Sequence, residues 1–237
     1  MRLDVYLTEK NLADTRTRAK NLIELGNVEV NGSIITKPAF FVQESDTVSV
    51  IENYAASLGS LKLEKALDVF KPEIKGKICL DLGAANGGFT DVLLQKGAKK
   101  VYALDIGECA LVDYLQNDPR VIIRDKTNAR FIKREDFNDK IDFITGDLSF
   151  ISLKLILPVA HDLLEKGECI FLIKPQFETE KKKIPKSGII KDSSLRKKIV
   201  DEICRFSQTL GFTVLGTTEA PHPFENKNQE YLLYLSK

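Results

Sequence analysis

The chain has 237 residues, of which 43% are hydrophobic, and its formal net charge is +1. This apolar content is enough for a sizeable core, and the length fits one large domain with a small one better than a single domain. A net charge so close to zero excludes a global basic field, so any site for nucleic acid must be local.

Cysteine usage and the N-terminus bear on the cellular compartment. The four cysteines are widely spaced and form no CxxC pair, which favours reduced core thiols over a disulfide scaffold. The opening "MRLDVYLTEK" contains no apolar signal core, and no stretch approaches the roughly 18 apolar residues of a membrane helix. We therefore expect a soluble, cytoplasmic protein with no membrane partner and no metal site. The sequence leaves its oligomeric state open.

Residues 1–53 have the pattern of a small α+β module. Apolar residues recur at helical spacing from Leu3 to Leu7, which predicts a short first helix. A second helix is predicted to begin at the capping residue Asp14 and to end at Gly26. The segment that follows alternates like short strands, and its "NG" is typical of a hairpin turn.

This module resembles the alpha-L RNA-binding domain, the S-four type named for a ribosomal small-subunit protein. The resemblance rests on "RLD", "TRTRA", "NLIELGNVEVNG", "KP" and "DTVSV". It implies contacts with RNA phosphates from Arg16, Arg18, Lys20 and Lys37. The module holds six Lys or Arg against eight Asp or Glu, so a solvated helix face is the alternative. The RNA interpretation stands beside it because phosphate contacts need local rather than net charge.

From Leu61 onward, an apolar strand, a turn and an amphipathic helix recur along the chain. This order predicts parallel βαβ units with right-handed crossovers. Strands such as "CIFLI" are apolar throughout, as expected where helices cover both faces of a sheet. We predict an α/β fold with a doubly wound, Rossmann-like sheet of seven strands in residues 61–237. A linker of residues 54–60 would join it to the first module.

The stretch "DLGAANGGFT", residues 81–90, follows the first of these strands. Its glycines let backbone pass close to a ligand at the carboxyl edge of the sheet, and the next helix adds free N–H groups. The spacing matches neither GxGxxG nor the phosphate-binding GxxxxGK. It resembles the first motif of class I S-adenosylmethionine-dependent methyltransferases, with a generic glycine turn as the alternative. The cofactor residues that this resemblance implies are Asp81, Gly83, Ala84, Gly87, Gly88 and Phe89.

Two further strands end in polar residues suited to the same cofactor. Asp105 ends the second strand, where an acid accepts hydrogen bonds from ribose hydroxyls in nucleotide and S-adenosylmethionine enzymes. The third strand ends in "IRDKTNAR", where either Asp125 or Asn128 could meet the adenine edge. The residues alone leave that choice open.

Four charged residues lie near the edge where the cofactor is expected. Asp147 follows the fourth strand, Lys174 ends the fifth, Glu230 precedes the last, and Lys62 lies in the helix before the first. Such a set suits activation of a ribose 2′-hydroxyl, because one lysine can accept its proton while the carboxylates orient the amines. The structural alternatives are a surface lysine at 62, an Asp147–Lys174 ion pair and a strand-edge acid at 230.

With these motifs the chain resembles the TlyA/hemolysin A family, an alpha-L domain fused to an FtsJ-like ribosomal RNA methyltransferase. The resemblance covers nearly the whole chain and rests on strings such as "LKLEKAL", "DLGAANGGFTDVLLQKGA", "TNAR" and "KPQFE". It implies S-adenosylmethionine-dependent 2′-O-methylation of ribosomal RNA cytidines, with ribosomal RNA or subunits as partner. It also implies an antiparallel last strand and a catalytic tetrad of Lys62, Asp147, Lys174 and Glu230.

The sequence departs from the family in two places. "SLGS" at residues 57–60 replaces the usual "SRGG", and "GAANGGF" replaces "GASTGGF". The first change lies beside Lys62, so an RNA-binding assembly factor with weakened catalysis is one alternative function. Membrane lysis, which the family's historical name suggests, is a second alternative function. The sequence offers neither a transmembrane helix nor a long amphipathic membrane helix for it.

A basic run follows the fifth strand. Residues 180–198 hold eight Lys or Arg against two acids. In a loop at the catalytic edge, Lys182 and Lys183 are predicted to contact the RNA backbone, with a solvated loop as the alternative.

Overall fold

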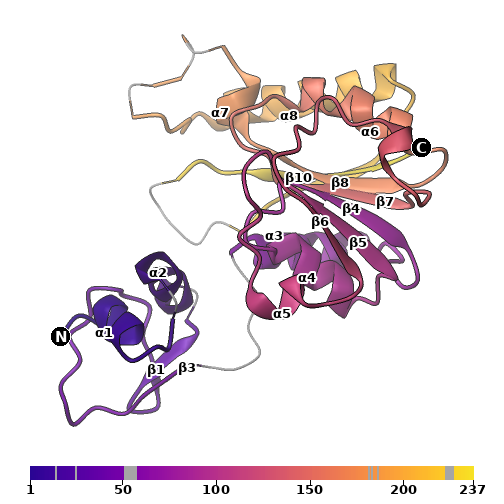
Figure 1. The fold of residues 1–237 in the computed structure, drawn as a ribbon. Coiled ribbons are helices and arrows are strands. Elements are labelled where there is room, and N and C mark those ends of the chain that lie inside the picture. Colours follow the sequence, from indigo (N-terminus) through magenta and orange to yellow (C-terminus); the bar gives the residue numbers. More distant parts are fainter. Residues whose placement is uncertain are drawn as a thin grey trace. The chain divides into compact units, whose positions relative to one another are not determined.

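The computed structural model of the chain describes residues 1–13, 15–24, 26–50, 58–180, 182, 184–185, 187–221 and 227–237, without the side chains of residues 17, 21 and 58. The chain divides into two compact units, Met1–Leu58 and Gly59–Lys237 (Figure 1). The predicted helix cap Asp14, the predicted RNA contact Lys183 and residues 54–57 of the predicted linker lie outside the described residues.

In the residues that the structure describes, the first unit combines two short helices with a three-stranded antiparallel sheet. Its elements are α1 (Leu3–Glu9), α2 (Arg16–Glu24), β1 (Val28–Val30), β2 (Ser33–Ile34) and β3 (Val48–Val50), with the strand order β2-β1-β3. Asn31 and Gly32, with φ of +53° and +74°, form the predicted two-residue turn between β1 and β2. Leu3, Leu7 and Ile23 are fully buried in a small core.

Local features explain where α2 begins and where it ends. The hydroxyl of Thr15 accepts a hydrogen bond from the N–H of Arg18 at 3.1 Å, so Thr15 caps the helix. Gly26, with φ of +74°, turns the chain after the last helical residue, as the sequence predicts.

The second unit is built on a seven-stranded sheet with the order β6-β5-β4-β7-β8-β10-β9. The strands are β4 (Ile78–Leu82), β5 (Lys100–Leu104), β6 (Val121–Arg124), β7 (Phe143–Gly146), β8 (Glu168–Ile173), β9 (Thr213–Glu219) and β10 (Tyr231–Ser236). Strands β4 to β8 pair in parallel, and β10 is antiparallel to both β8 and β9. The predicted seven strands and antiparallel last strand are thus confirmed.

Helices cover both faces of this sheet, which makes it doubly wound (Figure 1). On one face lie α3 (Leu58–Phe70), α4 (Gly88–Gln95) and α5 (Asp113–Gln116); on the other lie α6 (Leu157–Leu163), α7 (Pro175–Glu178) and α8 (Ser193–Thr209). In its described residues the unit also has the 3₁₀ helices η1 (Arg134–Asp136) and η2 (Leu153–Leu155). Because α3 begins at Leu58, residues 58–60 of the predicted linker belong to a helix.

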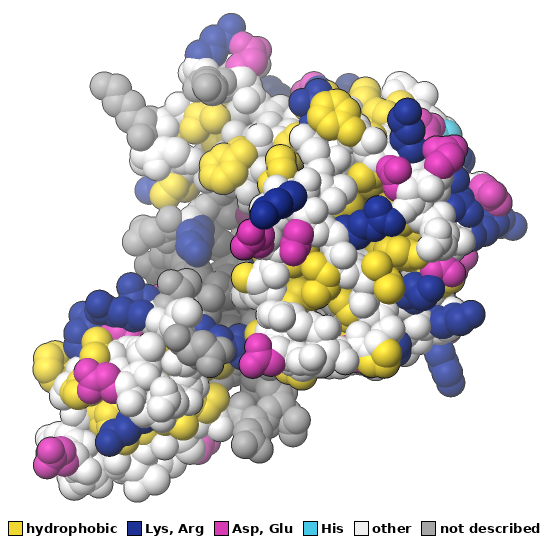
Figure 2. Space-filling model, in the orientation of Figure 1, with side chains coloured by type: hydrophobic (Ala, Val, Ile, Leu, Met, Phe, Trp, Pro, Cys, Tyr) yellow, Lys and Arg dark blue, Asp and Glu magenta, His cyan; other side chains and the backbone are white. Residues whose placement is uncertain are grey.

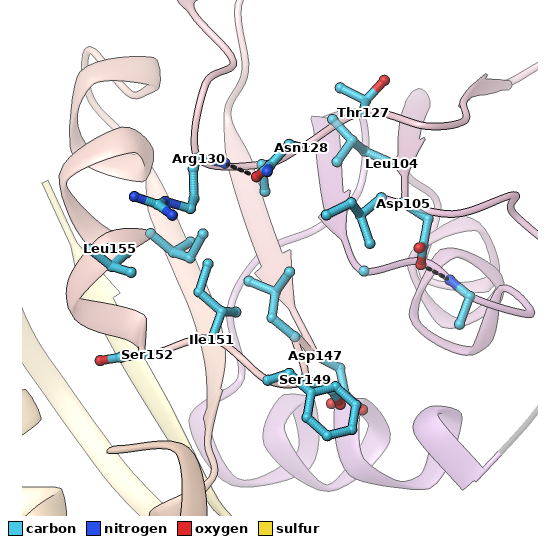
Figure 3. Close-up of a pocket in the computed structure, with 17 residues that line it drawn as sticks. Leu104, Asp105, Thr127, Asn128, Arg130, Asp147, Ser149, Ile151, Ser152 and Leu155 are labelled. Carbon is cyan, nitrogen blue, oxygen red and sulfur yellow. Dashed lines mark hydrogen bonds between the residues drawn. The ribbon is translucent and has the colours of Figure 1, made fainter. Parts of the chain in front are cut away.

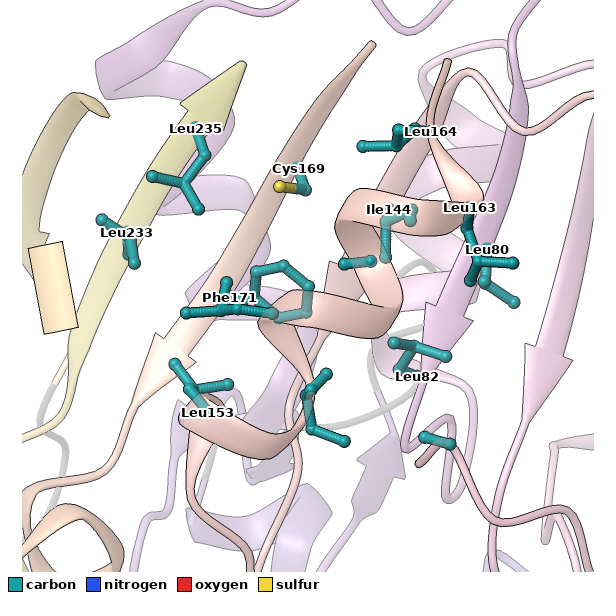
Figure 4. Close-up of a cluster of buried hydrophobic side chains, with 14 of the residues drawn as sticks. Leu80, Leu82, Ile144, Leu153, Leu163, Leu164, Cys169, Phe171, Leu233 and Leu235 are labelled. Carbon is teal, nitrogen blue, oxygen red and sulfur yellow. The ribbon is translucent and has the colours of Figure 1, made fainter. Parts of the chain in front are cut away.

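The main core lies between the sheet and the α6–α8 layer. Leu80, Ile144 and Phe171, from three adjacent strands, are fully buried there (Figure 4). A Cβ at Gly146 would lie 2.6 Å from the Phe171 ring, so glycine at the end of β7 makes room for that ring.

The strand order also determines where a ligand can bind. Strand β4 pairs with β5 on one side and with β7 on the other, so the order reverses at this point. In open α/β sheets, ligands bind in the crevice outside the carboxyl ends of the strands at such a reversal.

Candidate active site

The turn after β4 requires glycine for packing as well as for the approach of a ligand. Gly83 has a φ of +84°, and a Cβ on it would lie 2.9 Å from the carbonyl oxygen of Asp147. Gly87 has a φ of +91°, and a Cβ on it would lie 2.5 Å from the Leu115 side chain. The turn therefore lies directly against the end of β7, and both positions exclude larger residues even without a ligand.

Asp81, a predicted cofactor residue, lies beneath this turn. It is 1% exposed, and its carboxylate accepts hydrogen bonds from the hydroxyls of Thr90 at 2.7 Å and Thr145 at 3.1 Å. Burial raises the pKa of this carboxyl to about 7, against the opposing effect of the two hydroxyls. Asp81 therefore joins β4 to α4 and β7, and it is not part of the cavity wall.

A cavity of about 650 Å³ opens beside the turn, at the carboxyl edge of the sheet (Figure 3). Its size is typical of small-molecule sites. Figure 3 shows Asp105 and Asn128 on one side, apart from Asp147 and Ser149. The apolar part of the wall includes Leu104, Ile106, Leu148, Phe150, Ile151, Leu155 and Ile156.

Asp105 is held in the cavity wall by backbone groups. One carboxylate oxygen accepts the N–H of Ala85 at 3.0 Å and the other accepts the N–H of Gly107 at 2.9 Å. A carboxylate can accept about four hydrogen bonds, so two backbone donors leave capacity for ribose hydroxyls.

The structure separates the two candidates for the adenine edge. Asn128 lies in the cavity wall, and its side-chain oxygen accepts the N–H of Arg130 at 3.0 Å, which leaves its amide NH₂ as a donor. Asp125 is not part of the wall, and its carboxylate accepts the N–H of Cys109 at 2.5 Å.

Among the other predicted cofactor residues, Gly83 lines the cavity. Those that do not are Ala84, Gly87, Gly88 and Phe89, all of them buried. A carboxylate suited to ribose hydroxyls, an amide, and an apolar wall for a purine ring together fit S-adenosylmethionine.

The four predicted catalytic residues meet in one chain of ion pairs. The Lys62 ammonium from α3 lies 3.1 Å from the Asp147 carboxylate and 2.7 Å from the Glu230 carboxylate. The other oxygen of Asp147 lies 2.6 Å from the Lys174 ammonium. Segments separated by up to 168 positions along the chain, from 62 to 230, are thus joined at the carboxyl edge, and Asp147 links them to the cavity wall.

Burial and charge act against each other in this cluster. Burial alone would lower the pKa of Lys62, but Asp147 and Glu230 outweigh it and raise that pKa. Burial alone would raise the pKa of Asp147, but Lys62 and Lys174 outweigh it and lower that pKa. Lys62 is therefore a permanent ammonium and Asp147 a permanent carboxylate near neutral pH.

The departure "SLGS" brings one new contact beside this cluster. Ser60, where the family has glycine, is fully buried in α3 and donates its hydroxyl to the carbonyl oxygen of Gly88 at 3.1 Å. This bond ties the helix that carries Lys62 to the first turn of α4. The serine is therefore accommodated without an unpaired hydroxyl.

Sequence reasoning missed a set of contacts that holds the loop after Asp147. Ser149 accepts a hydrogen bond from the Lys174 ammonium at 2.8 Å. Two residues beyond the exposed Phe150, the Ser152 hydroxyl donates to Glu178 at 2.5 Å, and the N–H of Leu153 donates to the same carboxylate at 2.8 Å. The one available signal was a pair of polar residues, 149 and 152, in a loop that follows a strand-end acid.

The predicted RNA contacts differ in how freely they could reach a phosphate. The Arg16 guanidinium lies 3.0 Å from the buried Asp4 carboxylate, and Arg2 is a second partner of that acid. Together the two guanidinium groups lower the pKa of Asp4 to about 2 despite its burial. Arg16 is thus held within its unit. Arg18 is half-buried and has a partner of its own.

Three other predicted RNA contacts are exposed. They are Lys20 on α2, Lys37, and Lys182, whose ammonium lies 2.7 Å from Glu180. Lys and Arg side chains are interspersed with Asp and Glu on the face shown in Figure 2, in keeping with the near-zero net charge.

Comparison with known families gives a match for each unit. The FtsJ-like methyltransferase family matches residues 56–237, and the S4 domain matches residues 1–48.

Similar proteins match over nearly the full chain. Hemolysin A of Brachyspira hyodysenteriae is 42% identical over 99% of both chains. The 16S/23S rRNA (cytidine-2′-O)-methyltransferase TlyA of Mycobacterium tuberculosis is 38% identical over 99% of this chain and 89% of its own. A solved structure from Streptococcus thermophilus that carries the name hemolysin is 37% identical, covers 100% of this chain and 88% of its own, and has a TM-score of 0.78.

Proposed function

Because the chain belongs to the FtsJ-like methyltransferase family, and within it to the hemolysin A and TlyA group, we propose that it methylates the 2′-hydroxyl of a ribosomal RNA cytidine. The observation that carries this proposal is the ion-pair chain of Lys62, Asp147, Lys174 and Glu230 beside the cavity. S-adenosylmethionine, held by Asp105 and Asn128 against the apolar wall, would supply an electrophilic methyl group on a sulfonium.

Each member of the cluster has a separate task in this proposal. A ribose hydroxyl is a weak nucleophile, so its proton must move to a base as the new C–O bond forms. Lys174 is the base, because it contacts one carboxylate and a neutral hydroxyl, whereas Lys62 lies between two carboxylates. Asp147 holds both amines, and Glu230 keeps Lys62 in place.

RNA recognition would combine the S4 domain with the catalytic edge. Exposed Lys20, Lys37 and Lys182 are suited to phosphates, and the partner of Lys182 is the exposed Glu180 rather than a buried acid such as Asp4. Phe150 is 90% exposed beside the cavity, and an exposed ring suits stacking on a base that is splayed out of the RNA. A ribosomal substrate would place the enzyme in the cytoplasm.

The test is single-turnover transfer of a radiolabelled methyl group from S-adenosylmethionine to isolated ribosomal subunits that lack the modification. The variant is Lys174→Arg, because guanidinium does not release its proton at accessible pH. We expect wild-type transfer and a loss of about 10²–10⁴-fold in the variant, the contribution of a general base.

Lys77→Arg is the matched control for this test. The Lys77 ammonium lies 2.6 Å from Glu168, in a half-buried pair where β4 and β8 begin, at the opposite edge of the sheet. Its transfer rate should stay at the wild-type value. No transfer by the wild type would reject the proposed function, and wild-type transfer by Lys174→Arg would reject Lys174 as the base.

The alternatives are less well supported. An assembly factor with weakened catalysis is not favoured, because all four tetrad side chains are present and joined by ion pairs. A lytic activity is not favoured either, since the chain belongs to the FtsJ-like methyltransferase family. Over the described part of the chain, no helix has both the length and the apolar character needed to cross a membrane.

A further inference from the structure

We propose that Ser149 is a positioning residue that aims the Lys174 amine at the substrate hydroxyl, an inference that rests on the proposed function. The Lys174 Nζ donates to the Ser149 hydroxyl oxygen at 2.8 Å and lies 2.6 Å from a carboxylate oxygen of Asp147. Ser149 is exposed in the cavity wall, so this contact lies where a substrate would arrive.

The tetrahedral shape of the amine limits how many partners it can have. Nζ is tetrahedral, with Cε in one direction and three directions left for hydrogens or a lone pair. As a base, the neutral amine has two hydrogens and one lone pair. Among the described residues, the Ser149 hydroxyl accepts a hydrogen bond in one of these directions, and the Asp147 carboxylate lies at ion-pair distance, 2.6 Å, on another side of the amine. With Ser149 holding one hydrogen and Asp147 attracting the other, the lone pair is directed to the remaining side.

A single partner would not fix the direction of the Nζ lone pair. If Asp147 alone held the amine, Nζ would rotate about its own Cε bond and the lone pair would have no preferred direction. The hydroxyl of Ser149 also adds no charge, so it leaves the charge balance of the cluster unchanged. Orientation of a reacting group accounts for a large part of the rate in well-aligned reactions.

The loop that carries Ser149 is held by the helix that follows Lys174. Glu178, mostly buried, accepts the Ser152 hydroxyl and the Leu153 N–H. The rings of Phe150 and Phe177 lie 5.1 Å apart between centroids. Residues 149–153 and 174–178 are thus joined at three successive points, which fixes Ser149 relative to the amine it contacts.

The step that Ser149 supports is a proton transfer coupled to methyl transfer. The O–H bond of the ribose hydroxyl breaks and its proton takes up the Nζ lone pair. The freed electron pair on oxygen forms the new C–O bond to the methyl group, and the electron pair of the broken C–S bond stays on sulfur. Ser149 touches only the lysine in this step, so it acts through Lys174.

The test compares Ser149→Ala with Ser149→Thr in the full chain, by single-turnover methyl transfer to isolated ribosomal subunits from radiolabelled S-adenosylmethionine. Water can enter the space that alanine leaves but is not fixed there, so the expected loss is about 10-fold, well below that of the base itself. Threonine keeps the hydroxyl, and its extra methyl has room because Ser149 is exposed, so it should recover most of the rate. Affinities for S-adenosylmethionine and for the subunits should stay within about twofold.

Ser207→Ala is the matched control. Its hydroxyl is fully buried in α8 and donates to the carbonyl of Ile203 at 2.8 Å, away from the cluster. It should transfer methyl at the wild-type rate.

Three results would overturn the inference while leaving the proposed function intact. They are a wild-type rate in Ser149→Ala, a rate in Ser149→Thr as low as in Ser149→Ala, and a loss explained by weaker cofactor or subunit binding. No transfer by the wild type would instead reject the proposed function, and this inference with it.

Discussion

Replacing Asp147 by asparagine should destabilise the methyltransferase unit, because this one carboxylate neutralises two lysines. Its oxygens lie 3.1 Å from the Lys62 ammonium and 2.6 Å from the Lys174 ammonium. Both Lys62 and Asp147 side chains are 19% exposed, and that of Lys174 is 9% exposed. Asparagine keeps the shape and removes the charge, so the cluster changes from neutral to a net charge of +1.

The cost follows from the burial of these groups. Removing one partner of a buried ion pair costs about 3–5 kcal/mol, because the remaining charge stays buried and uncompensated. Partial exposure and the second carboxylate, Glu230, favour the lower end, about 3 kcal/mol. For a unit of this size, that corresponds to a decrease in Tm of about 6–12 °C.

A double-mutant cycle with Lys62→Met tests the cause of this loss. Methionine removes one cation and keeps the apolar stem, so the double variant is neutral again. If the two single losses were additive, they would predict a certain free energy of unfolding for the double variant. We expect the measured value to exceed that prediction by at least about 1 kcal/mol. The measurement is calorimetric unfolding of all four proteins. Additivity within about 0.5 kcal/mol would refute the shared ion-pair chain.

Four further predictions concern other parts of the molecule. Asp81 has a folded pKa of about 7, above its value in the unfolded chain, so its ionisation destabilises the fold as pH rises from about 4 to about 7. The Tm of Asp81→Asn should therefore rise relative to that of the wild type as pH increases from about 5 to about 8. A Tm difference that stays constant over this range would contradict the raised pKa of Asp81. Asn128→Ala should weaken calorimetric binding of S-adenosylmethionine by about threefold to tenfold. Asp125→Ala should not, and equal losses would remove Asn128 from the adenine site. Lys20→Ala should lower ribosomal RNA affinity and its salt dependence without changing Tm. Arg16→Ala should lower the Tm of the first unit through the buried Asp4, and an unchanged Tm would show that this pair is not structural.

Strand ends could be predicted from the sequence, and with them much of the candidate site. Asp105, Asp147 and Lys174 each follow an apolar run, and parallel strands bring such positions to one edge. Lys62 lies outside this rule, since it comes from the helix before the first strand, and its place in the tetrad was implied by the family resemblance. The hairpin at Asn31–Gly32 was predictable because its turn type demands positive φ at both residues.

Contacts between loops could not be predicted in this way. Ser149 and Glu178 follow no periodic pattern, and their roles depend on how the loops after β7 and β8 lie against each other. Asp81 can be buried because its carboxylate accepts hydrogen bonds from hydroxyls of α4 and β7. No sequence pattern predicts that these hydroxyls face it. Arg16 looks like a free cation in the sequence, since its partner Asp4 lies twelve residues earlier, on another helix.

The central claim is that the methyl group goes to a ribose hydroxyl, and alkaline hydrolysis of the labelled RNA tests it most directly. Alkaline cleavage of RNA requires a free 2′-hydroxyl, so a 2′-O-methyl group protects the adjacent phosphodiester bond. If the wild-type protein methylates ribose, the label will be recovered in alkali-resistant dinucleotides whose first nucleoside is cytidine. Recovery of the label in mononucleotides would place the methyl group on a base and contradict the account.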